Sequence, residues 1–548
     1  MSASQQKKSR QDKKAAYMTE RQRQEAQEAK KLKIYTRTFW IVLALCVCIV
    51  LTTVLSNPVK NVLFQNNTAV TVGEHSLNSV QLNYYYIDSV NNYYNTYGSY
   101  AFLMGIDFSK PLNKQVYEEE TGKTWADYFL ESATTTIKST YALYELALKD
   151  GFELSEDEKK SIESSFSTME LYAMMYGYDD ANGYLRALYG NGADVDSYRE
   201  YTTVNQIANS YYAEYADTLD YTDEEIRNYE ASKDEDGNER YNNFTSFTYA
   251  TYYLPYSKWT PSKDADGKTI TYTDEQKNEA RAKAKAAAEA LAAGNYEDLD
   301  AFDAAIKAME INKDQKTGIT CSRNEDLLYS SVNSLFIDWL TEEGRKEGDM
   351  TVIEYASGEG ENKVINGYYV VRYGSFNENK FALKDVRHIL ISFEGGKYNS
   401  NTGETTYTDA EKKAALKKAE ELYEQWKKGD MTEDSFAKLA KEKSTDPGSK
   451  DEGGLYENVY PGQMVEKFED FCYAEDRKPG DHGIVESNYG YHIMFFVGDS
   501  DLTYRDFMIK NALTNEELEQ WLEDLIENLE FTLVSDKHVE KDLVLTAA

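Results

Sequence analysis

KDVRHILISF at residues 384–393 and SNYGYHIMFF at residues 487–496 are the two stretches that decide the fold of this 548-residue chain. Each places one histidine, His388 or His492, among the apolar residues of a predicted strand. Because side chains alternate between the two faces of a strand, we expect both rings to point inward from one sheet. A single histidine of this kind is usually a satisfied core residue, whereas two on adjacent strands indicate a functional site.

These stretches belong to a unit that occurs twice in the chain. Residues 271–302 (TYTDEQKNEARAKAKAAAEALAAGNYEDLDAF) parallel residues 406–436 (TYTDAEKKAALKKAEELYEQWKKGDMTEDSF). Residues 335–354 (LFIDWLTEEGRKEGDMTVIE) parallel residues 467–486 (KFEDFCYAEDRKPGDHGIVE). Each copy begins with a strand, continues through three helices and closes with a β-hairpin. The second half of the chain is therefore predicted to hold two tandem α+β units.

The part of the chain before this repeat is predicted to be helical. Hydrophobic residues recur at three and four positions in 125–150, 155–178 and 180–216, as they do on the buried face of a helix. A further helix is predicted for 514–531. The chain holds 46 tyrosines, and many lie in this helical region. They either bind peptide or pack as half-buried helix residues, and the sequence leaves both readings open.

The N-terminal segment differs in charge from the rest of the chain. Residues 1–38 are rich in Lys and Arg, although the whole chain carries a formal charge of −35. Residues 39–55, FWIVLALCVCIVLTTVL, contain no charge and approach the shortest helix that crosses a bilayer. This asymmetry predicts a single-pass anchor with a cytoplasmic N-terminus and residues 56–548 outside. A cleaved signal peptide and a lipoprotein signal are weaker alternatives, since neither Cys46 nor Cys48 follows a small residue.

Composition also narrows the classes of partner and ligand. An acidic chain is a poor match for nucleic acid, which needs basic surfaces. Beyond the predicted anchor only Cys321 and Cys472 remain, and their spacing fits no metal motif. Two isolated buried thiols are expected, with a disulfide as the alternative. DEDGNE at 234–239 and DADGK at 264–268 lack the glutamate that an EF-hand needs, so both are interpreted as exposed turns.

Five motifs of the second unit resemble, in order and spacing, the parvulin family of peptidyl-prolyl isomerases. They are VRHILI, STDPGSKDEGGLY, PGQMVEKFEDFCY, KPGDHGIV and SNYGYHIMFF, within residues 384–499. The resemblance implies that His388 and His492 are the family's paired histidines and that Asp446 faces the reacting peptide bond. Ser487 would supply a supporting hydroxyl. The implied pocket for the proline ring consists of Leu455, Met464 and Phe468.

These residue types suit the isomerisation of an X–Pro bond. The reaction passes through a twisted amide against a barrier of about 18–20 kcal/mol, and no covalent bond forms or breaks. The protein needs only to bind the twisted form more tightly than the planar ones, so no metal or cofactor is expected. The alternatives are ordinary core packing for Met464 and Phe468 and an Asp-Pro turn at Asp446.

The first unit departs from the motif residues. Alignment of the strands puts Tyr252 and Tyr369 where the second unit has its histidines, and Val332 where it has Met464. No counterpart of the motif aspartate is recognisable in 307–325. The first unit is therefore predicted to be parvulin-shaped but inactive.

The whole layout resembles the SurA-like, PrsA-like and PpiD-like extracytoplasmic foldases. The expected fold class is α+β, with an N-terminal transmembrane helix, a helical SurA-like chaperone module, two tandem parvulin-like units and a C-terminal helix. The expected parts are a basic cytoplasmic tail at 1–38, the anchor at 39–55, the module at 56–242, the degenerate unit at 243–376, the active isomerase domain at 381–499 and a segment returning to the module at 500–548.

The predicted function is that of a membrane-anchored peptidyl-prolyl isomerase and chaperone. Its expected partners are unfolded or partly folded secreted polypeptides that contain X–Pro bonds. One alternative is a holdase that uses both parvulin units only for binding, and another is a substrate-binding or adhesion protein. Intact His388, Asp446 and His492 favour the enzyme, and the sequence shows no specific site for the last alternative.

Overall fold

The computed structural model describes most of the chain in two compact units. The described residues are 60–234, 237–263, 267–313, 318–358, 360–399 and 404–545. The predicted basic tail and the predicted anchor lie outside them. No helix of the described part is both long and apolar enough to cross a bilayer. Within the described residues, the first compact unit joins 60–219 to 516–545, and the second compact unit, 220–515, contains both repeats found in the sequence.

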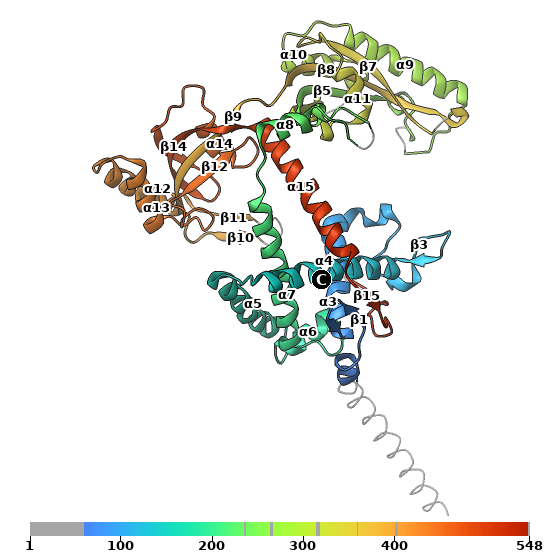
Figure 1. Cartoon of the computed structure of the whole chain (residues 1–548). Helices are drawn as coiled ribbons and strands as arrows, with labels where there is room; N and C mark the ends of the chain where they lie inside the picture. Colours follow the sequence, from blue (N-terminus) through green and yellow to red (C-terminus); the bar gives the residue numbers. More distant parts are fainter. Residues whose placement is uncertain are drawn as a thin grey trace, which may run out of the picture. The chain divides into compact units, whose positions relative to one another are not determined.

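The first unit is mainly helical, with a small antiparallel sheet (Figure 1). Its helices are α3 (Ser79–Tyr97), α4 (Trp125–Asp150), α5 (Glu156–Met175), α6 (Ala181–Tyr189) and α7 (Val195–Thr218). Its three-stranded sheet has the order β15-β1-β2, formed by β1 (Val70–Val72), β2 (His75–Leu77) and β15 (Phe531–Leu533). A separate hairpin consists of β3 (Val116–Glu118) and β4 (Lys123–Thr124). The pairing of β15 with β1 brings the two ends of the described chain together.

Polar caps define the helix ends in this unit. Thr124 and Asp127 form a capping box at the start of α4, and Gly151 ends the helix in the left-handed conformation with φ of 74°. The C-terminal part of α15 (Tyr504–Glu527) belongs to the same unit. There the Trp521 ring stacks on Tyr215 of α7, with 3.9 Å between ring centroids. Aromatic packing therefore attaches the last helix to the helical unit.

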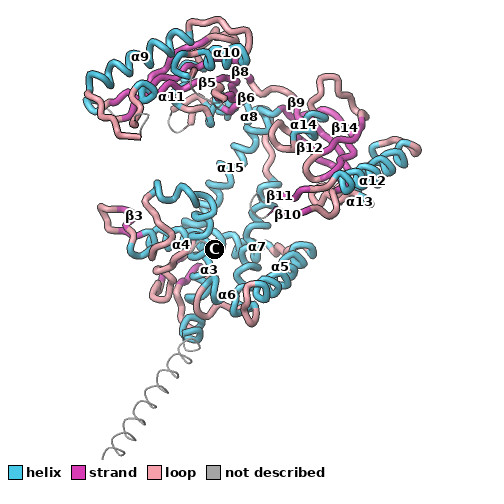
Figure 2. Tube along the Cα trace, turned by 180° about the vertical axis from the view of Figure 1, so that it is seen from behind, coloured by secondary structure: helices cyan, strands magenta, loops and turns pink. Residues whose placement is uncertain are grey.

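The second unit contains two four-stranded antiparallel sheets with matching strand order (Figures 1 and 2). The first sheet, β6-β5-β8-β7, consists of β5 (Ser246–Pro255), β6 (Ser322–Leu328), β7 (Met350–Ser357) and β8 (Val364–Asn377). The second, β12-β9-β14-β13, consists of β9 (Ala382–Ser392), β12 (Leu455–Val459), β13 (His482–Glu486) and β14 (Gly490–Thr503). Helix α8 (Asp223–Glu230) precedes the first sheet, and the hairpin of β10 (Lys397–Asn399) and β11 (Glu404–Thr406) follows β9.

Each sheet is covered by two helices on one face and by one short helix on the other. In the first sheet these are α9 (Asp274–Ala292) and α10 (Leu299–Ala308) against α11 (Ser334–Leu340). In the second they are α12 (Asp409–Lys427) and α13 (Glu433–Lys443) against α14 (Glu466–Cys472). We call the face with two helices the helical face and the other the open face. The alternation of strand side chains decides which residues reach which face.

Candidate active site

Strands β9 and β14 bring the two predicted histidines together on the open face of the second sheet. His388 lies opposite Met494 and His492 opposite Leu390, so the two rings are diagonal neighbours. Their Nδ1 atoms are 3.0 Å apart, and the ring centroids are 5.2 Å apart. Both residues are buried, with exposed fractions of 2% and 5%. The expectation that both rings point inward from one sheet is confirmed.

The loop after α13 places Asp446 beside this pair. The backbone N–H of Thr445 donates to the carbonyl of Leu390 at 2.9 Å, and the Leu390 N–H donates to Ser444 Oγ at 3.2 Å. These bonds tie the loop to the strand that carries His388. They hold Asp446 Oδ2 at 2.9 Å from His388 Nε2.

Asp446 Oδ2 accepts three hydrogen bonds. Besides His388, it accepts from the hydroxyls of Ser449 and Tyr456, the latter at 3.1 Å. The hydrogen bond from His388, followed by that from Ser449, holds the pKa of Asp446 far below its usual range despite partial burial. The carboxylate is therefore ionised at neutral pH. Its other oxygen, Oδ1, has a single long contact, with the N–H of Gly448 at 3.5 Å.

His492 extends the hydrogen bonding to Ser487, whose Oγ lies 2.7 Å from His492 Nε2. Burial, and then the neighbouring His388, lowers the pKa of His492 to about 4, so this ring is neutral at pH 7. A consistent set of protons follows. Ser487 donates to His492 Nε2, and His492 donates from Nδ1 to His388 Nδ1. His388 then donates from Nε2 to Asp446, so the chain of donors ends on the ionised group.

A cavity of about 520 Å³ opens over this hydrogen-bonded chain. The Phe468 ring of α14 lies edge-to-face with both histidines, with centroid distances of 5.3 Å to His388 and 5.6 Å to His492. The cavity's apolar wall consists of Leu390, Phe393, Met464, Val465 and Phe468. The site therefore combines a polar base with an apolar wall.

The structure brings most of the predicted site residues to this cavity. Those that line it are His388, Asp446, Met464, Phe468 and His492. Ser487 does not line it but bonds to one of the lining histidines. Leu455 lies elsewhere, because it pairs with Arg387 in the β12–β9 ladder and so points to the helical face. The next residue, Tyr456, points to the open face and lines the cavity instead.

Sequence reasoning missed Ser449 and Tyr456, both of which bond to Asp446. Both lie within the motif that contains Asp446, so the motif already carried the signal. Strand alternation also predicts that Leu455 and Tyr456 face opposite sides. Tyr489, which lines the cavity with 64% of its surface exposed, was also missed, although it lies within the motif that contains His492.

The register of the first sheet corrects the sequence alignment by one residue. In the second sheet, the residue opposite His388 comes two positions after His492. The same step from Tyr369 leads to a residue opposite Thr251. Thr251, rather than Tyr252, therefore takes the place of His388, since a one-residue slip moves a side chain to the other face.

The open face of the first sheet is aromatic where the second sheet has its histidines. Tyr369 stacks on Tyr253 with 4.6 Å between centroids, and Phe336 of α11 packs edge-on at 5.1 Å. Tyr252 instead lies in the core of the helical face, where its hydroxyl accepts from the Asn312 side chain at 2.9 Å. The first sheet thus keeps the packing of an open face without the chain of polar groups.

The structure was also compared with the requirements of a metal site. Within the described ranges, no group of three or more His, Cys, Asp or Glu side chains is arranged to hold a metal ion. Cys321 and Cys472 are both buried free thiols. Burial raises the pKa of the Cys472 thiol to about 12, so this group is protonated and unreactive at neutral pH.

Comparison with known proteins gives matches that centre on the second sheet. Residues 368–498 match the PPIC-type PPIase domain, from within β8 to β14. Foldase protein PrsA 1 of Listeria innocua is 38% identical over 108 residues, which are 18% of this chain and 35% of the relative. Foldase protein PrsA 3 of Bacillus cereus is 31% identical over 127 residues, 23% of this chain and 43% of the relative.

Among solved structures, a crystal structure of PrsA from Bacillus cereus matches with 27% identity and a TM-score of 0.17, over 30% of this chain and 57% of that one. The chain spans about a third of the length of the first Listeria relatives it matches, 35% in each of two species. The similarity thus covers the second sheet and its helices, where the histidine pair and Asp446 lie. By this match and this geometry, residues 368–498 are similar to the PPIC-type peptidyl-prolyl isomerase domain.

Proposed function

We propose that this protein is a peptidyl-prolyl cis-trans isomerase and chaperone, with His388, Asp446 and His492 as its catalytic residues and Ser487 as a positioning hydroxyl. The observation that carries the proposal is the hydrogen-bonded chain from Ser487 to an ionised Asp446 beneath an apolar-walled cavity. A proline ring held against Phe468 would set the preceding carbonyl beside the carboxylate.

The ionised carboxylate favours the twisted amide. In a planar amide, conjugation places negative charge on the carbonyl oxygen and double-bond character in the C–N bond. A carboxylate beside that oxygen destabilises the charge-separated form more than the twisted form, in which conjugation is lost. The barrier to rotation therefore falls. Oδ1 of Asp446, whose one contact is with the Gly448 N–H at 3.5 Å, is the carboxylate oxygen that lies without a close donor and can face that carbonyl.

The two histidines hold the carboxylate in place. The imidazole N–H of His388 donates to Oδ2 and so orients Asp446. The bond between the rings fixes both tautomers, and Phe468 and the strand pairing fix both ring planes. Preorganisation of this kind avoids a rearrangement during the reaction.

Exposed apolar side chains of the first unit support the chaperone part of the proposal. Several residues at the end of α5 and in the following turn are more than half exposed: Leu171 56%, Met174 72%, Met175 68% and Tyr176 65%. The segment after α3 exposes Tyr100 69%, Phe102 69% and Leu103 71%. Large apolar groups that remain in water favour binding of unfolded polypeptide.

The cellular setting is proposed from the sequence. The uncharged residues 39–55 would anchor the chain in the membrane, with residues 56–548 outside the cell and unfolded secreted polypeptides as clients. The domain limits given under Sequence analysis belong to this proposal. Protease added to intact cells should digest most of the chain and leave a small basic fragment. A mature protein that begins near residue 57 would contradict the anchor.

An isomerase assay on the full chain tests the catalytic part. The protein should accelerate cis-to-trans conversion of an X–Pro tetrapeptide, and it should separately suppress aggregation of an unfolded client. The holdase alternative predicts suppression of aggregation with no acceleration of the tetrapeptide. That outcome would overturn the enzymatic assignment and keep the binding role.

A further inference from the structure

The first sheet buries an arginine, Arg372, on one of its central strands. Arg372 of β8 is 4% exposed, on the helical face of the sheet. Its Nη2 donates to the carbonyl of Tyr296 at 3.3 Å, while its Nε has no hydrogen-bond partner. No ion pair of the described residues includes its guanidinium. Because a buried charge without a partner strongly destabilises a fold, this arrangement requires an explanation.

The second sheet carries an arginine on the same face but on its other central strand, β9, and neutralises it. Arg387 of β9 bonds through Nε to Glu433 at 2.9 Å and through Nη1 to the carbonyls of Glu452 and Gly453 at 2.8 and 3.1 Å. Glu433 is the first residue of α13, and the first residue of the corresponding α10 is Leu299. The start of α10 therefore has no carboxylate at the position from which α13 neutralises Arg387.

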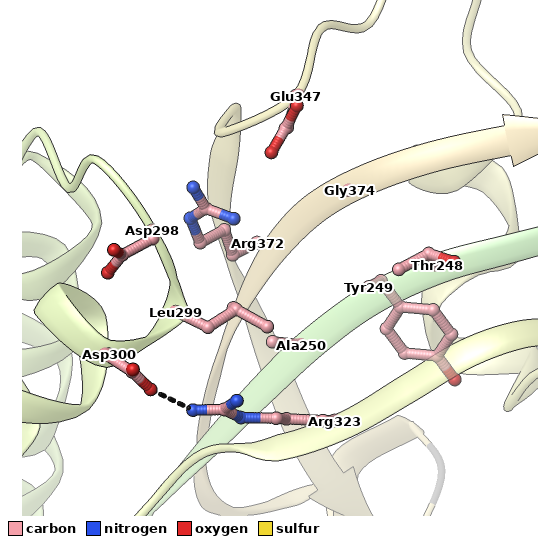
Figure 3. A pocket seen from close by; sticks show the side chains of 10 residues that line it. All are labelled: Thr248, Tyr249, Ala250, Asp298, Leu299, Asp300, Arg323, Glu347, Arg372 and Gly374. Carbon is pink, nitrogen blue, oxygen red and sulfur yellow. Dashed lines mark hydrogen bonds and ion pairs between the residues drawn. The ribbon is translucent and has the colours of Figure 1, made fainter.

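A cavity of about 330 Å³ occupies this place in the first sheet (Figure 3). Its other charges are mostly committed. Arg323 pairs with Asp300 and Asp303, each at 2.9 Å, and Asp298 caps α10 by accepting from the Ala301 N–H at 2.7 Å. In Figure 3 a dashed line joins Asp300 to Arg323, and none reaches the remaining pair of charges, Arg372 and Glu347.

We propose that this cavity binds a carboxylate of a polypeptide, either the C-terminal group or an Asp or Glu side chain. The guanidinium of Arg372 lines the cavity and can donate to a carboxylate oxygen. The start of α10 borders the same cavity and adds N–H groups that have no acceptor within the helix. Tyr249, Ala250 and Leu299 provide an apolar wall for the stem of the ligand.

Glu347 at the exposed side of the cavity acts as an internal competitor. Its carboxylate borders the same cavity as Arg372. A ligand carboxylate that enters the cavity is therefore repelled by the negative charge of Glu347. Removal of this charge should therefore raise affinity for an external carboxylate. That the ligand is a polypeptide rests on the proposed foldase function, whereas the carboxylate chemistry rests on Arg372 alone.

Calorimetric titration of the full chain at low ionic strength tests the proposal. The probes are N-acetyl-Ala-Ala-Leu with a free C-terminus, the same peptide as its amide, an amidated N-acetyl-Ala-Glu-Leu, and inorganic phosphate. The free acid should bind at least about tenfold more tightly than its amide, a difference of about 1.4 kcal/mol. Equal binding of the amidated Glu peptide assigns the site to side-chain carboxylates as well, and binding of phosphate alone overturns the proposal.

Three variants complete the test. Arg372→Met should abolish the preference for the free acid, Glu347→Gln should strengthen acid binding severalfold, and the control Arg387→Met in the other sheet should keep the preference. The exposed Glu347→Gln keeps the proposal falsifiable if Arg372→Met fails to fold. Absence of any preference in both wild type and Glu347→Gln would overturn it. Because the tetrapeptide isomerase assay is run on the same preparation, such a result would stand apart from a failure of the proposed function.

Discussion

The two sheets of the second compact unit share a strand order and a pattern of covering helices. They differ in the polar and charged side chains on their two faces. On its open face the second sheet buries His388 and His492 in a hydrogen-bonded chain, where the first sheet buries the apolar contact of Tyr369 with its aromatic neighbours. On the helical face the second sheet neutralises Arg387, and the first leaves Arg372 without an ion-pair partner.

This difference separates the residues that maintain the fold from those that maintain the chemistry. Phe336 and Phe468 occupy matching places in α11 and α14. Phe336 packs edge-to-face with Tyr369 of β8, and Phe468 packs in the same way with His492 of β14. The apolar contact survives in both sheets, while the polar chain survives in one. The fold therefore tolerates loss of the site, because packing does not depend on the histidines.

The largest expected effect tests the shared packing. Phe468→Ala and Phe336→Ala should each destabilise their own sheet by about 3–5 kcal/mol, since both rings are almost fully buried. The buried thiols of Cys472 and Cys321 report the two sheets separately, through their rates of labelling in denaturant. Only the Phe468 variant should also lose isomerase activity. Loss of activity in Phe336→Ala with Cys472 still protected would contradict the independence of the two sheets.

The second prediction concerns the polar chain. Asp446→Ala and His492→Ala should each lower kcat/KM on an X–Pro tetrapeptide by at least about tenfold, a loss of about 1.4 kcal/mol in transition-state binding. The matched changes Thr251→Ala and Tyr369→Phe in the first sheet should leave kcat/KM within about twofold. If the first-sheet variants abolish turnover and the second-sheet variants do not, the active unit is misassigned.

The third prediction follows from the lowered pKa of His492, about 4 in the folded protein against a usual 6.5. Between these values the unfolded chain binds more protons than the folded one, so stability rises with pH across this window. The second sheet should lose up to about 1.4 kcal/mol per pH unit as pH falls from 6.5 towards 4. Labelling of Cys472 by a disulfide reagent active in acid measures this loss.

Two controls sharpen that measurement. Cys321 should show no comparable dependence, because the first sheet has no buried histidine on its open face. His492→Phe should remove most of the slope at Cys472. An unchanged slope in that variant would assign the pH dependence to other groups.

The smallest expected effect tests a one-residue distinction on β12. Tyr456→Phe removes a hydrogen bond to Asp446 and should lower kcat/KM about threefold, while the ring stays in place. Leu455→Ala should leave kcat/KM within about twofold, since Leu455 points to the helical face. A larger effect from Leu455 than from Tyr456 would show that the strand register differs in solution.

The sequence was most informative where a feature depends on neighbours along the chain. Residues 125–150 were predicted as one helix, and α4 has the same bounds, because its capping box, hydrophobic period and terminal glycine are all local. The repeat and the inward direction of the two histidines could be predicted from the sequence for the same reason. The places predicted for Tyr252 and Leu455 were wrong. The period of a strand is two residues, so an error of one position moves a side chain to the opposite face.

By itself, therefore, the sequence determined the helices, the order of the two repeated units and the motif residues of the second one. Only the tertiary structure decided that Thr251 stands in for His388, that Ser449 and Tyr456 join the bonds to Asp446, and that Arg372 lacks the carboxylate that Arg387 has. Each of these facts is a pairing between segments far apart in the chain. Such a pairing depends on strand register and on which helix start reaches which strand, and neither is encoded in a local pattern.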